Sequence, residues 1–220
     1  MVAQPASVDL RAGPVAHAIR RERLIVILRR VEPQARLVSL VEELVDAGAR
    51  IFEVTFDGSS AVEDLLACRE ILDRTHPGED EAYVGAGTIR DSGQLTSAAA
   101  AGAAFAVSPV LDATVAADAA RLGIPFIPGA FSPTEVDRAW RLGATFVKLF
   151  PASALGPSFV RELRGPLPEV ETIVTGGVDA TNGRAFVEAG AAAVGIGSAI
   201  VRAGPDERRA TVAAIRGVRA

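Results

Sequence analysis

The sequence predicts an α/β protein in which eight strands alternate with helices and close into a (β/α)8 barrel. Three observations support this fold class. Short apolar runs recur along the chain, as in strands that are buried on both faces of a parallel sheet. Most of these runs follow a glycine that can end a helix in the left-handed cap conformation. The chain of 220 residues is also long enough for one such barrel.

The predicted elements follow one another in a regular order. A charged helix at Ala16–Arg23 precedes the first strand, Leu24–Leu28. Two further strands are Tyr83–Ala86 and Thr172–Val174. The remaining five strands belong to segments in which a glycine is followed at once by an apolar run: Asp46–Thr55, Ala101–Pro109, Leu122–Gly129, Leu142–Pro151 and Ala189–Gly197.

Helix starts lie between these strands. Ser132–Glu135 has the pattern of a capping box with proline at the first helical position, and Asp91–Gln94 is a weaker version. Strands and helices that alternate with short connections imply a parallel sheet, with a doubly wound open sheet as the structural alternative to a barrel. No linker divides the chain, so we expect a single domain over residues 1–220, with residues 1–23 as an N-terminal helical extension. The segment Asp73–Glu81 is expected to be an acidic, solvated loop.

Composition argues against several classes of function. The net charge of −4 and the scattered arginines form no basic stripe, so nucleic acid is not expected as a partner. The chain shows no apolar signal-peptide region and no run of the roughly 18 apolar residues that a membrane helix needs. Cys68 is the only cysteine, which excludes an internal disulfide and indicates a reducing compartment. We therefore expect a cytoplasmic protein without a membrane partner.

Histidine is also scarce. His17 belongs to the charged N-terminal helix and His76 to a polar loop, and neither lies near another candidate residue. A zinc site or a Ser/His/Asp triad would need histidine as a ligand or base. We therefore expect no metal and no cofactor.

The C-terminal ends of the strands carry the candidate functional residues, because barrel enzymes place their active sites there. Alternation along the second strand turns Ile51, Glu53 and Thr55 inward. The same pattern turns Phe146 and Lys148 inward on the sixth strand. Residues of one barrel layer come from alternate strands, so Glu53 and Lys148 are expected to approach each other across the lumen.

Lys148 is the only lysine in the chain, whereas every other basic side chain is arginine. Arginine supplies charge equally well but does not lose a proton at ordinary pH. A single lysine in an apolar strand therefore indicates chemistry that needs an amine, such as Schiff-base formation with a carbonyl. Two structural alternatives remain at this point: a lysine that extends from the strand end to solvent, and a buried ion pair with Glu53.

Glycines at the ends of the last two strands suggest an anion site. Gly176 and Gly177 follow the seventh strand, and Gly197 and Ser198 follow the eighth. Barrel enzymes often bind a substrate phosphate at these positions, with help from a short helix that here would begin at Ser198. Neither a P-loop nor a complete dinucleotide-binding motif is present.

Taken in order, these motifs resemble a known family. They are Glu53-Val-Thr55, Gly85-Ala-Gly-Thr88, Ser108-Pro109, Pro128-Gly129, Lys148-Leu-Phe-Pro-Ala152, Thr175-Gly-Gly177 and Gly195-Ile-Gly-Ser198. From about Leu24 to Arg202 the chain is similar to the 2-keto-3-deoxy-6-phosphogluconate (KDPG) aldolases, which include 4-hydroxy-2-oxoglutarate and 6-phosphogalactonate aldolases. The resemblance implies a class I pyruvate aldolase on a (β/α)8 barrel, a homotrimer that needs no metal.

The resemblance also implies a role for each motif. Lys148 would be the Schiff-base lysine and Glu53 the general acid and base. Thr88 would contact the carboxylate of the pyruvate moiety, and Pro109 and Phe150 would shape its pocket. The distal phosphate would be held by Gly176, Gly177, Gly197 and Ser198.

One position departs from the family pattern. Some members carry arginine two residues after the threonine of Glu-Val-Thr, where it contacts the substrate carboxylate, whereas this chain has Asp57. A second carboxylate is expected to repel a keto acid at short range. Arg29, at the end of the first strand, is the candidate replacement.

The function expected from the sequence is reversible cleavage of a phosphorylated 2-keto-3-deoxy sugar acid to pyruvate and glyceraldehyde 3-phosphate, so the partners are a small keto acid and a phosphorylated aldehyde. The other aldolases of the same family are alternatives. A sugar-phosphate isomerase or epimerase without a covalent intermediate is a third possibility, and a binding or regulatory barrel that has lost catalysis is a fourth.

Overall fold

Strands and helices alternate along the chain, as the sequence predicts. The computed structural model describes residues 9–77 and 82–218, and these ranges contain ten helices and nine strands. The strands are β1 (Leu24–Leu28), β2 (Ile51–Thr55), β3 (Tyr83–Gly87), β4 (Ala106–Val107), β5 (Phe126–Ile127), β6 (Gly129–Ala130), β7 (Val147–Leu149), β8 (Thr172–Thr175) and β9 (Ala193–Ile196). The helices are α1 (Pro14–Glu22), α2 (Gln34–Asp46), α3 (Ala61–Thr75), α4 (Ser92–Ala100), α5 (Ala113–Leu122), α6 (Pro133–Arg141), α7 (Ala152–Leu163), α8 (Gly183–Glu188), α9 (Ser198–Arg202) and α10 (Pro205–Arg216).

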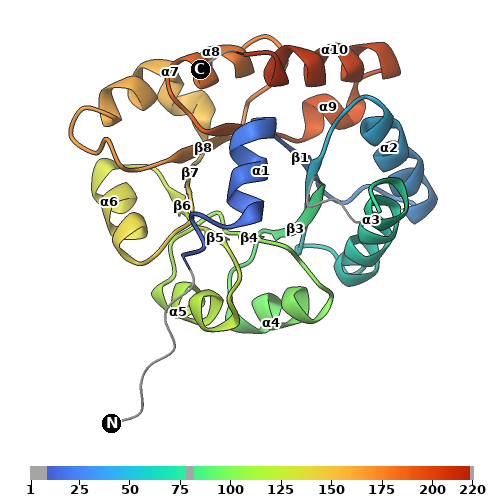
Figure 1. The fold of residues 1–220 in the computed structure, drawn as a ribbon, viewed down its shortest axis with the longest axis horizontal. Helices are drawn as coiled ribbons and strands as arrows, with labels where there is room; N and C mark the ends of the chain where they lie inside the picture. The colour runs from blue at the N-terminus through green and yellow to red at the C-terminus, as the bar shows by residue number, and fades with distance from the viewer. Residues whose placement is uncertain (1–8, 78–81, 219–220) are drawn as a thin grey trace.

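The strands form one parallel sheet that is curved into a barrel, with helices around it (Figure 1). Its order is β5-β4-β3-β2-β1-β9-β8-β7-β6. The two end strands are halves of one segment, Phe126–Ala130, which is divided at Pro128. Proline has no N–H to donate, but its carbonyl accepts a hydrogen bond from the Lys148 N–H at 2.9 Å. The predicted barrel is confirmed, and the predicted fifth strand accounts for two of the nine.

Side chains separate into two cores according to strand alternation. Phe52, Val54, Val147 and Leu149 belong to the large cluster between the sheet and the outer helices. The lumen holds a second cluster to which the strands contribute Ile25, Ile51, Phe105, Val107, Ile127, Phe146, Ile173 and Ala193. The inward and outward faces of β2 and β7 are therefore those that alternation predicts.

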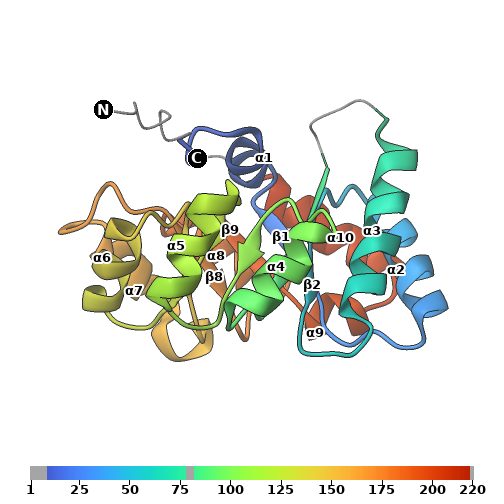
Figure 2. The ribbon, with the colours of Figure 1, turned by 90° about the horizontal axis from the view of Figure 1, so that it is seen from below.

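Helix α1 closes one end of the barrel. Val15, Ala16, Ala18 and Ile19 pack into the lumen cluster, and both views show α1 across this end (Figures 1 and 2). The sequence predicts this helix only as an extension, because its apolar stripe does not reveal which surface it covers. In the structure it is part of the core. That residues 1–220 form a single domain stays a prediction.

The helix ends agree with their sequence signals. Ser132 and Glu135 form the predicted capping box, and Asp91 accepts a hydrogen bond from the Gln94 N–H. The expected helix-ending glycines all have positive φ: Gly48, Gly102, Gly123, Gly143 and Gly190. Helix α3 reaches Thr75, so the predicted loop from Asp73 to Glu81 begins later than expected, and residues 78–81 of it lie outside the described residues.

The described residues offer neither a membrane-spanning helix nor a cluster of metal ligands. No helix within residues 9–77 and 82–218 is long and apolar enough to cross a membrane. The same ranges contain no group of three or more His, Cys, Asp or Glu side chains arranged to hold a metal ion. The expectation that the protein needs no metal stays a prediction.

Candidate active site

Lys148 lies in the lumen of the barrel, in the middle of β7. Its side chain points to the same side as Phe146, and the residue is only 5% exposed. Its Nζ atom is 5.3 Å from the centroid of the Phe150 ring. Burial lowers the pKa of Lys148, the Glu53 carboxylate raises it, and Arg29 lowers it further. Because burial is the largest of these effects, the site increases the fraction of neutral amine.

Glu53 points into the same lumen from β2 and is 2% exposed. Burial raises the pKa of Glu53, whereas Lys148 and Arg29 lower it. Its Oε1 atom has no hydrogen-bond partner among the described residues. Glu53 and Lys148 therefore influence each other across the lumen, while a carboxylate oxygen stays available for proton transfer.

Gly87 makes room for this carboxylate. A Cβ atom at position 87 would lie 1.9 Å from Glu53 Oε1 and 2.5 Å from its Cδ. Real Cβ atoms do not approach other heavy atoms so closely, so the glycine on β3 is needed for Glu53 to occupy its place. The motif Gly85-Ala-Gly-Thr88 pointed to this strand, but the sequence did not show that its second glycine faces Glu53.

Further polar groups line this end of the lumen. Thr55 on β2 and Thr175 on β8 are 3% exposed and follow the inward faces of their strands. Their Oγ1 atoms, like Oδ1 of Asp57, are buried and have no hydrogen-bond partner in the described part of the chain. Buried polar groups are usually paired, so this concentration of unpaired oxygens around Lys148 and Glu53 indicates a site for a polar ligand. Alternation with the inward-facing Ile51 and Ile173 was the signal that could have identified the two threonines.

Two arginine side chains contact the Asp57 carboxylate. Its Oδ2 atom is 3.1 Å from Arg29 Nη1 and 3.6 Å from Arg30 Nε. Arg29 also donates from Nη2 to Thr88 Oγ1 at 3.3 Å. Two guanidinium groups therefore contact the Asp57 carboxylate and offset its charge, and the expected repulsion of a keto acid by Asp57 stays a prediction. Arg29 and Thr88, both candidates from the sequence, are brought together, whereas Arg30 was missed.

Pro109 and Phe150 belong to the loops that follow β4 and β7. A Cβ atom at Gly129 would lie 2.2 Å from the Pro109 carbonyl oxygen, and Gly129 is paired with Lys148 in the sheet. Phe150 directly follows β7 and is 39% exposed. Phe150 thus places its ring near the amine, and the main chain of Pro109 packs against the strand that pairs with Lys148, while the role of both residues in a pyruvate pocket stays a prediction.

The glycines after β8 lie close to the same loop. Gly176 and Gly177 have φ angles of 87° and 79°. A Cβ atom at Gly176 would be 2.9 Å from the Phe150 ring, and one at Gly177 would be 2.6 Å from Ser153 Cβ. Positive φ and close approach both require glycine here.

Gly197 and Ser198 follow β9, the neighbour of β8 in the sheet. Ser198 is exposed and begins the five-residue helix α9. A Cβ atom at Gly197 would meet nothing closer than 3.6 Å, so space does not require glycine at this position. The two glycine segments are thus at the ends of adjacent strands.

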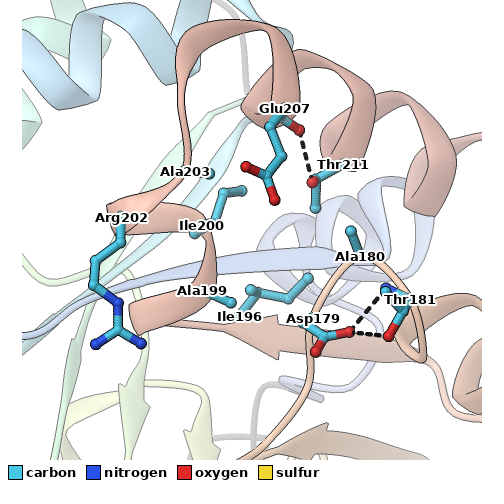
Figure 3. A pocket seen from close by; sticks show the side chains of 10 residues that line it. All are labelled: Asp179, Ala180, Thr181, Ile196, Ala199, Ile200, Arg202, Ala203, Glu207 and Thr211. Carbon is cyan, nitrogen blue, oxygen red and sulfur yellow. Dashed lines mark hydrogen bonds between the residues drawn. The ribbon is translucent and has the colours of Figure 1, made fainter.

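A cavity of about 350 Å³ lies behind α9, between the loop after β8 and α10 (Figure 3). Asp179 and Glu207 contribute carboxylates to it, and Thr181 donates to Asp179 Oδ1 at 2.6 Å. Figure 3 shows the Arg202 guanidinium directed away from both carboxylates. Two carboxylates disfavour a further anion, so this cavity is not suited to a phosphate. Neither Lys148 nor Glu53 contributes to it.

The chain is similar to several known proteins. The 2-dehydro-3-deoxy-phosphogluconate aldolase of Treponema pallidum is 37% identical over 76% of this chain and 77% of its own length. The 2-dehydro-3-deoxy-6-phosphogalactonate aldolase of Escherichia coli K12 is 32% identical over 84% of this chain and 88% of its own.

A solved structure of KDPG aldolase from Legionella pneumophila, with pyruvate captured at low pH as a covalent carbinolamine intermediate, is 28% identical. The structural match covers 96% of this chain and 100% of the Legionella chain, with a TM-score of 0.75. Residues 15–215 match the family model described as KDPG and KHG aldolase. The chain therefore belongs to the KDPG and KHG aldolase family and is an aldolase, a carbon–carbon lyase.

Proposed function

We propose that this protein is a class I aldolase that reversibly cleaves a 2-keto-3-deoxy-6-phospho sugar acid of the KDPG type to pyruvate and glyceraldehyde 3-phosphate. One observation carries the proposal: the only lysine of the chain is buried in the barrel lumen, where burial lowers its pKa, and it faces a buried carboxylate of raised pKa. Covalent catalysis through a Schiff base needs a neutral amine and a nearby proton carrier.

The reaction begins with attack of the neutral Lys148 Nζ on the C2 carbonyl carbon. The carbonyl oxygen takes up a proton and the attacking nitrogen loses one, which gives a neutral carbinolamine. Loss of this hydroxyl as water then leaves an iminium. Glu53 supplies and removes the protons of these steps, because burial raises its pKa and makes the protonated form easier to reach than at an exposed carboxylate.

Cleavage of the C3–C4 bond follows. Glu53 as a carboxylate removes the proton of the C4 hydroxyl, and the C4–O bond becomes a carbonyl. The electron pair of the C3–C4 bond moves into the iminium, which becomes a neutral enamine, and the aldehyde leaves. Protonation of the enamine at C3 and hydrolysis of the resulting iminium release pyruvate and regenerate the amine.

The two ends of the substrate have separate binding groups in this proposal. Arg29 and Thr88 bind the carboxylate next to C2, and the Phe150 ring and Pro109 enclose the pyruvate moiety. The distal phosphate binds to backbone N–H groups at Gly176, Gly177, Gly197 and Ser198. Helix α9 has only five residues, so the N–H groups, rather than a helix dipole, are expected to supply this binding. Binding energy at the phosphate is remote from the reacting bond and can contribute to orientation.

The decisive experiment is reductive trapping. The protein is incubated with pyruvate and borohydride, and the modified residue is located by mass spectrometry. The N-terminal amine is the only competing primary amine, because the chain has a single lysine. We expect one reduced adduct at Lys148, and none in Lys148→Arg, which keeps the charge. A folded wild-type protein that gives no adduct would refute the Schiff-base mechanism, and turnover retained in Lys148→Arg would favour a non-covalent isomerase.

The identity of the aldehyde needs a second experiment. The relatives include both a phosphogluconate-type and a phosphogalactonate-type aldolase, which act on different substrates. We expect glyceraldehyde 3-phosphate to be a better acceptor than its unphosphorylated form, and the configuration of C4 in the product separates the two types. Glyoxylate as the best acceptor would favour a 4-hydroxy-2-oxoglutarate aldolase instead.

We also propose that the enzyme is a cytoplasmic homotrimer, on the basis of the family resemblance and the reducing compartment that the single cysteine indicates. Light scattering at the working concentration tests the assembly directly. A molar mass of one or two chains, with full activity, would contradict it.

A further inference from the structure

Asp57 connects the two loops that border the catalytic end of β1 and β2. Its carboxylate contacts Arg29 and Arg30, and its backbone carbonyl accepts a hydrogen bond from Arg30 Nη2 at 2.7 Å. The Asp57 side chain is 20% exposed, whereas those of Arg29 and Arg30 are 56% and 60% exposed. The carboxylate is thus the inner anchor of two arginines that reach toward solvent.

The backbone around this group adopts uncommon conformations. Arg30 has a φ angle of 46° and Thr88 one of 60°. The other non-glycine residue with positive φ in the described chain is Arg23, which caps the end of α1. Strained residues of this kind persist where the surroundings hold them, and they concentrate at ligand sites. Two strained residues in contact with Arg29 or Asp57 indicate that this group of side chains is held in a set arrangement.

The charges of the group favour an anion. Two guanidinium groups and one carboxylate leave one net positive charge at the mouth of the lumen. Arg29 donates from Nη1 toward Asp57 and from Nη2 toward Thr88 at 3.3 Å, so its planar head is fixed from two sides. An arginine that is fixed before binding loses less entropy when it pairs with a carboxylate.

We propose that Asp57 is a positioning residue that holds Arg29 beside Thr88 as the receptor for the carboxylate of the 2-keto acid. Arg30 offsets the charge of Asp57 and holds its main chain. This inference rests on the proposed function, because it assigns the keto-acid end of the same site. Asp57 contributes through Arg29 and makes no contact with the reacting atoms.

The substitution Asp57→Asn shows whether Asp57 positions Arg29 or only repels the keto acid, because the two roles change pyruvate affinity in opposite directions. Removal of the carboxylate makes the site more positive, so repulsion alone predicts that pyruvate binds more tightly. Positioning predicts the opposite, because Arg29 is released. We expect the half-saturating pyruvate concentration in trapping to rise about tenfold, which corresponds to about 1.4 kcal/mol, with a much smaller change in the maximal rate. The Arg30 bond to the Asp57 carbonyl does not involve the substituted group and should keep the loop in place.

Three further variants complete the test. Arg29→Gln is expected to raise the half-saturating concentration at least as much, and Arg29→Gln with Asp57→Asn is expected to match Arg29→Gln alone. Asp137→Asn removes a carboxylate that contacts Arg141 at 2.9 Å on α6 and should leave the half-saturating concentration unchanged. Additive effects of the two active-site substitutions, or tighter binding in Asp57→Asn, would overturn the proposal.

Calorimetric titration with pyruvate separates this proposal from the Schiff-base mechanism. If the wild-type protein binds pyruvate without forming an adduct, the Schiff-base mechanism fails, and weaker binding in Asp57→Asn still supports the role of Asp57. If the wild-type protein forms the adduct and both active-site variants bind pyruvate normally, the role of Asp57 fails alone. If the wild-type protein does not bind pyruvate at all, both proposals fail.

Discussion

Gly87 offers the most direct test of where Glu53 must lie. The substitution Gly87→Ala would put a Cβ atom 1.9 Å from Glu53 Oε1 and 2.6 Å from its Cγ. Ordinary van der Waals contact begins at 3.4 Å, so the carboxylate must move by about 1.5 Å. Gly87 does not have positive φ, so alanine introduces no backbone strain. The perturbation is therefore a displacement of one catalytic carboxylate.

The size of the effect follows from this displacement. A misplacement of about 1 Å in a reacting group can cost about 100-fold in rate, which corresponds to about 2.7 kcal/mol of activation free energy. Overpacking of the lumen should also lower the free energy of unfolding by about 1 to 3 kcal/mol. We expect kcat for cleavage to fall about 100-fold. Glu53 also moves the protons of carbinolamine and iminium formation, so formation of the pyruvate adduct should slow as well.

Gly85→Ala is the matched control. The nearest atoms to its Cβ atom would be those of the Phe105 ring, at 2.5 Å, so the clash lowers stability in the same strand through Phe105 and not through the Glu53 carboxylate. The assays are kcat for cleavage of the keto acid and thermal unfolding of each variant. A Gly87→Ala enzyme with wild-type kcat would show that the Glu53 carboxylate is not the group that transfers the proton. Equal losses of kcat in both variants would assign the effect to general damage.

Three other predictions use the remaining charged and buried groups. The rate of pyruvate trapping should rise with pH as Lys148 loses its proton. The substitution Glu53→Gln should move the midpoint of this pH dependence to lower pH, because the carboxylate raises the pKa of Lys148. A midpoint at higher pH in the variant would contradict this. Arg20→Ala removes the hydrogen bonds to Glu171 and should lower the free energy of unfolding by about 1 kcal/mol without changing kcat, as measured by urea unfolding and steady-state kinetics. Burial raises the pKa of the Cys68 thiol to about 12. Iodoacetamide at pH 8 should therefore label Cys68 only as fast as the protein unfolds. Rapid labelling of the native protein would be inconsistent with this burial.

The barrel and the inward side chains could be predicted because both follow from local patterns. A period of two along a strand determines which residues share a face, so Ile51 and Phe146 placed Glu53 and Lys148 on the inward side. The requirement that a buried charge be paired or functional then singled out these two groups. Glycine after five of the helices marked where the next strand begins, and positive φ at those glycines agrees with this interpretation.

Contacts between distant loops could not be predicted in the same way. Asp57 and Arg29 are far apart in the sequence and meet because β1 and β2 pair in parallel, with Ile27 opposite Glu53. Charge alone indicated repulsion at Asp57, since the sequence does not report distances between side chains. The covering role of α1 was also hidden, because an apolar stripe gives no information about its partner.

The two ends of the lumen serve opposite requirements. At the α1 end, Ile25, Phe146 and Ile19 pack closely, and the lumen contributes to stability there. At the other end, Glu53 Oε1 and Thr175 Oγ1 are buried without partners among the described residues, which lowers stability until a ligand satisfies them. A substrate that forms hydrogen bonds with these groups binds with a favourable free energy, because the folded chain alone leaves these hydrogen bonds unformed. This division explains why one barrel tolerates a buried lysine and a buried carboxylate that do not simply neutralise each other. It also implies that substitutions at the α1 end should change stability, whereas those at the catalytic end should change binding and rate.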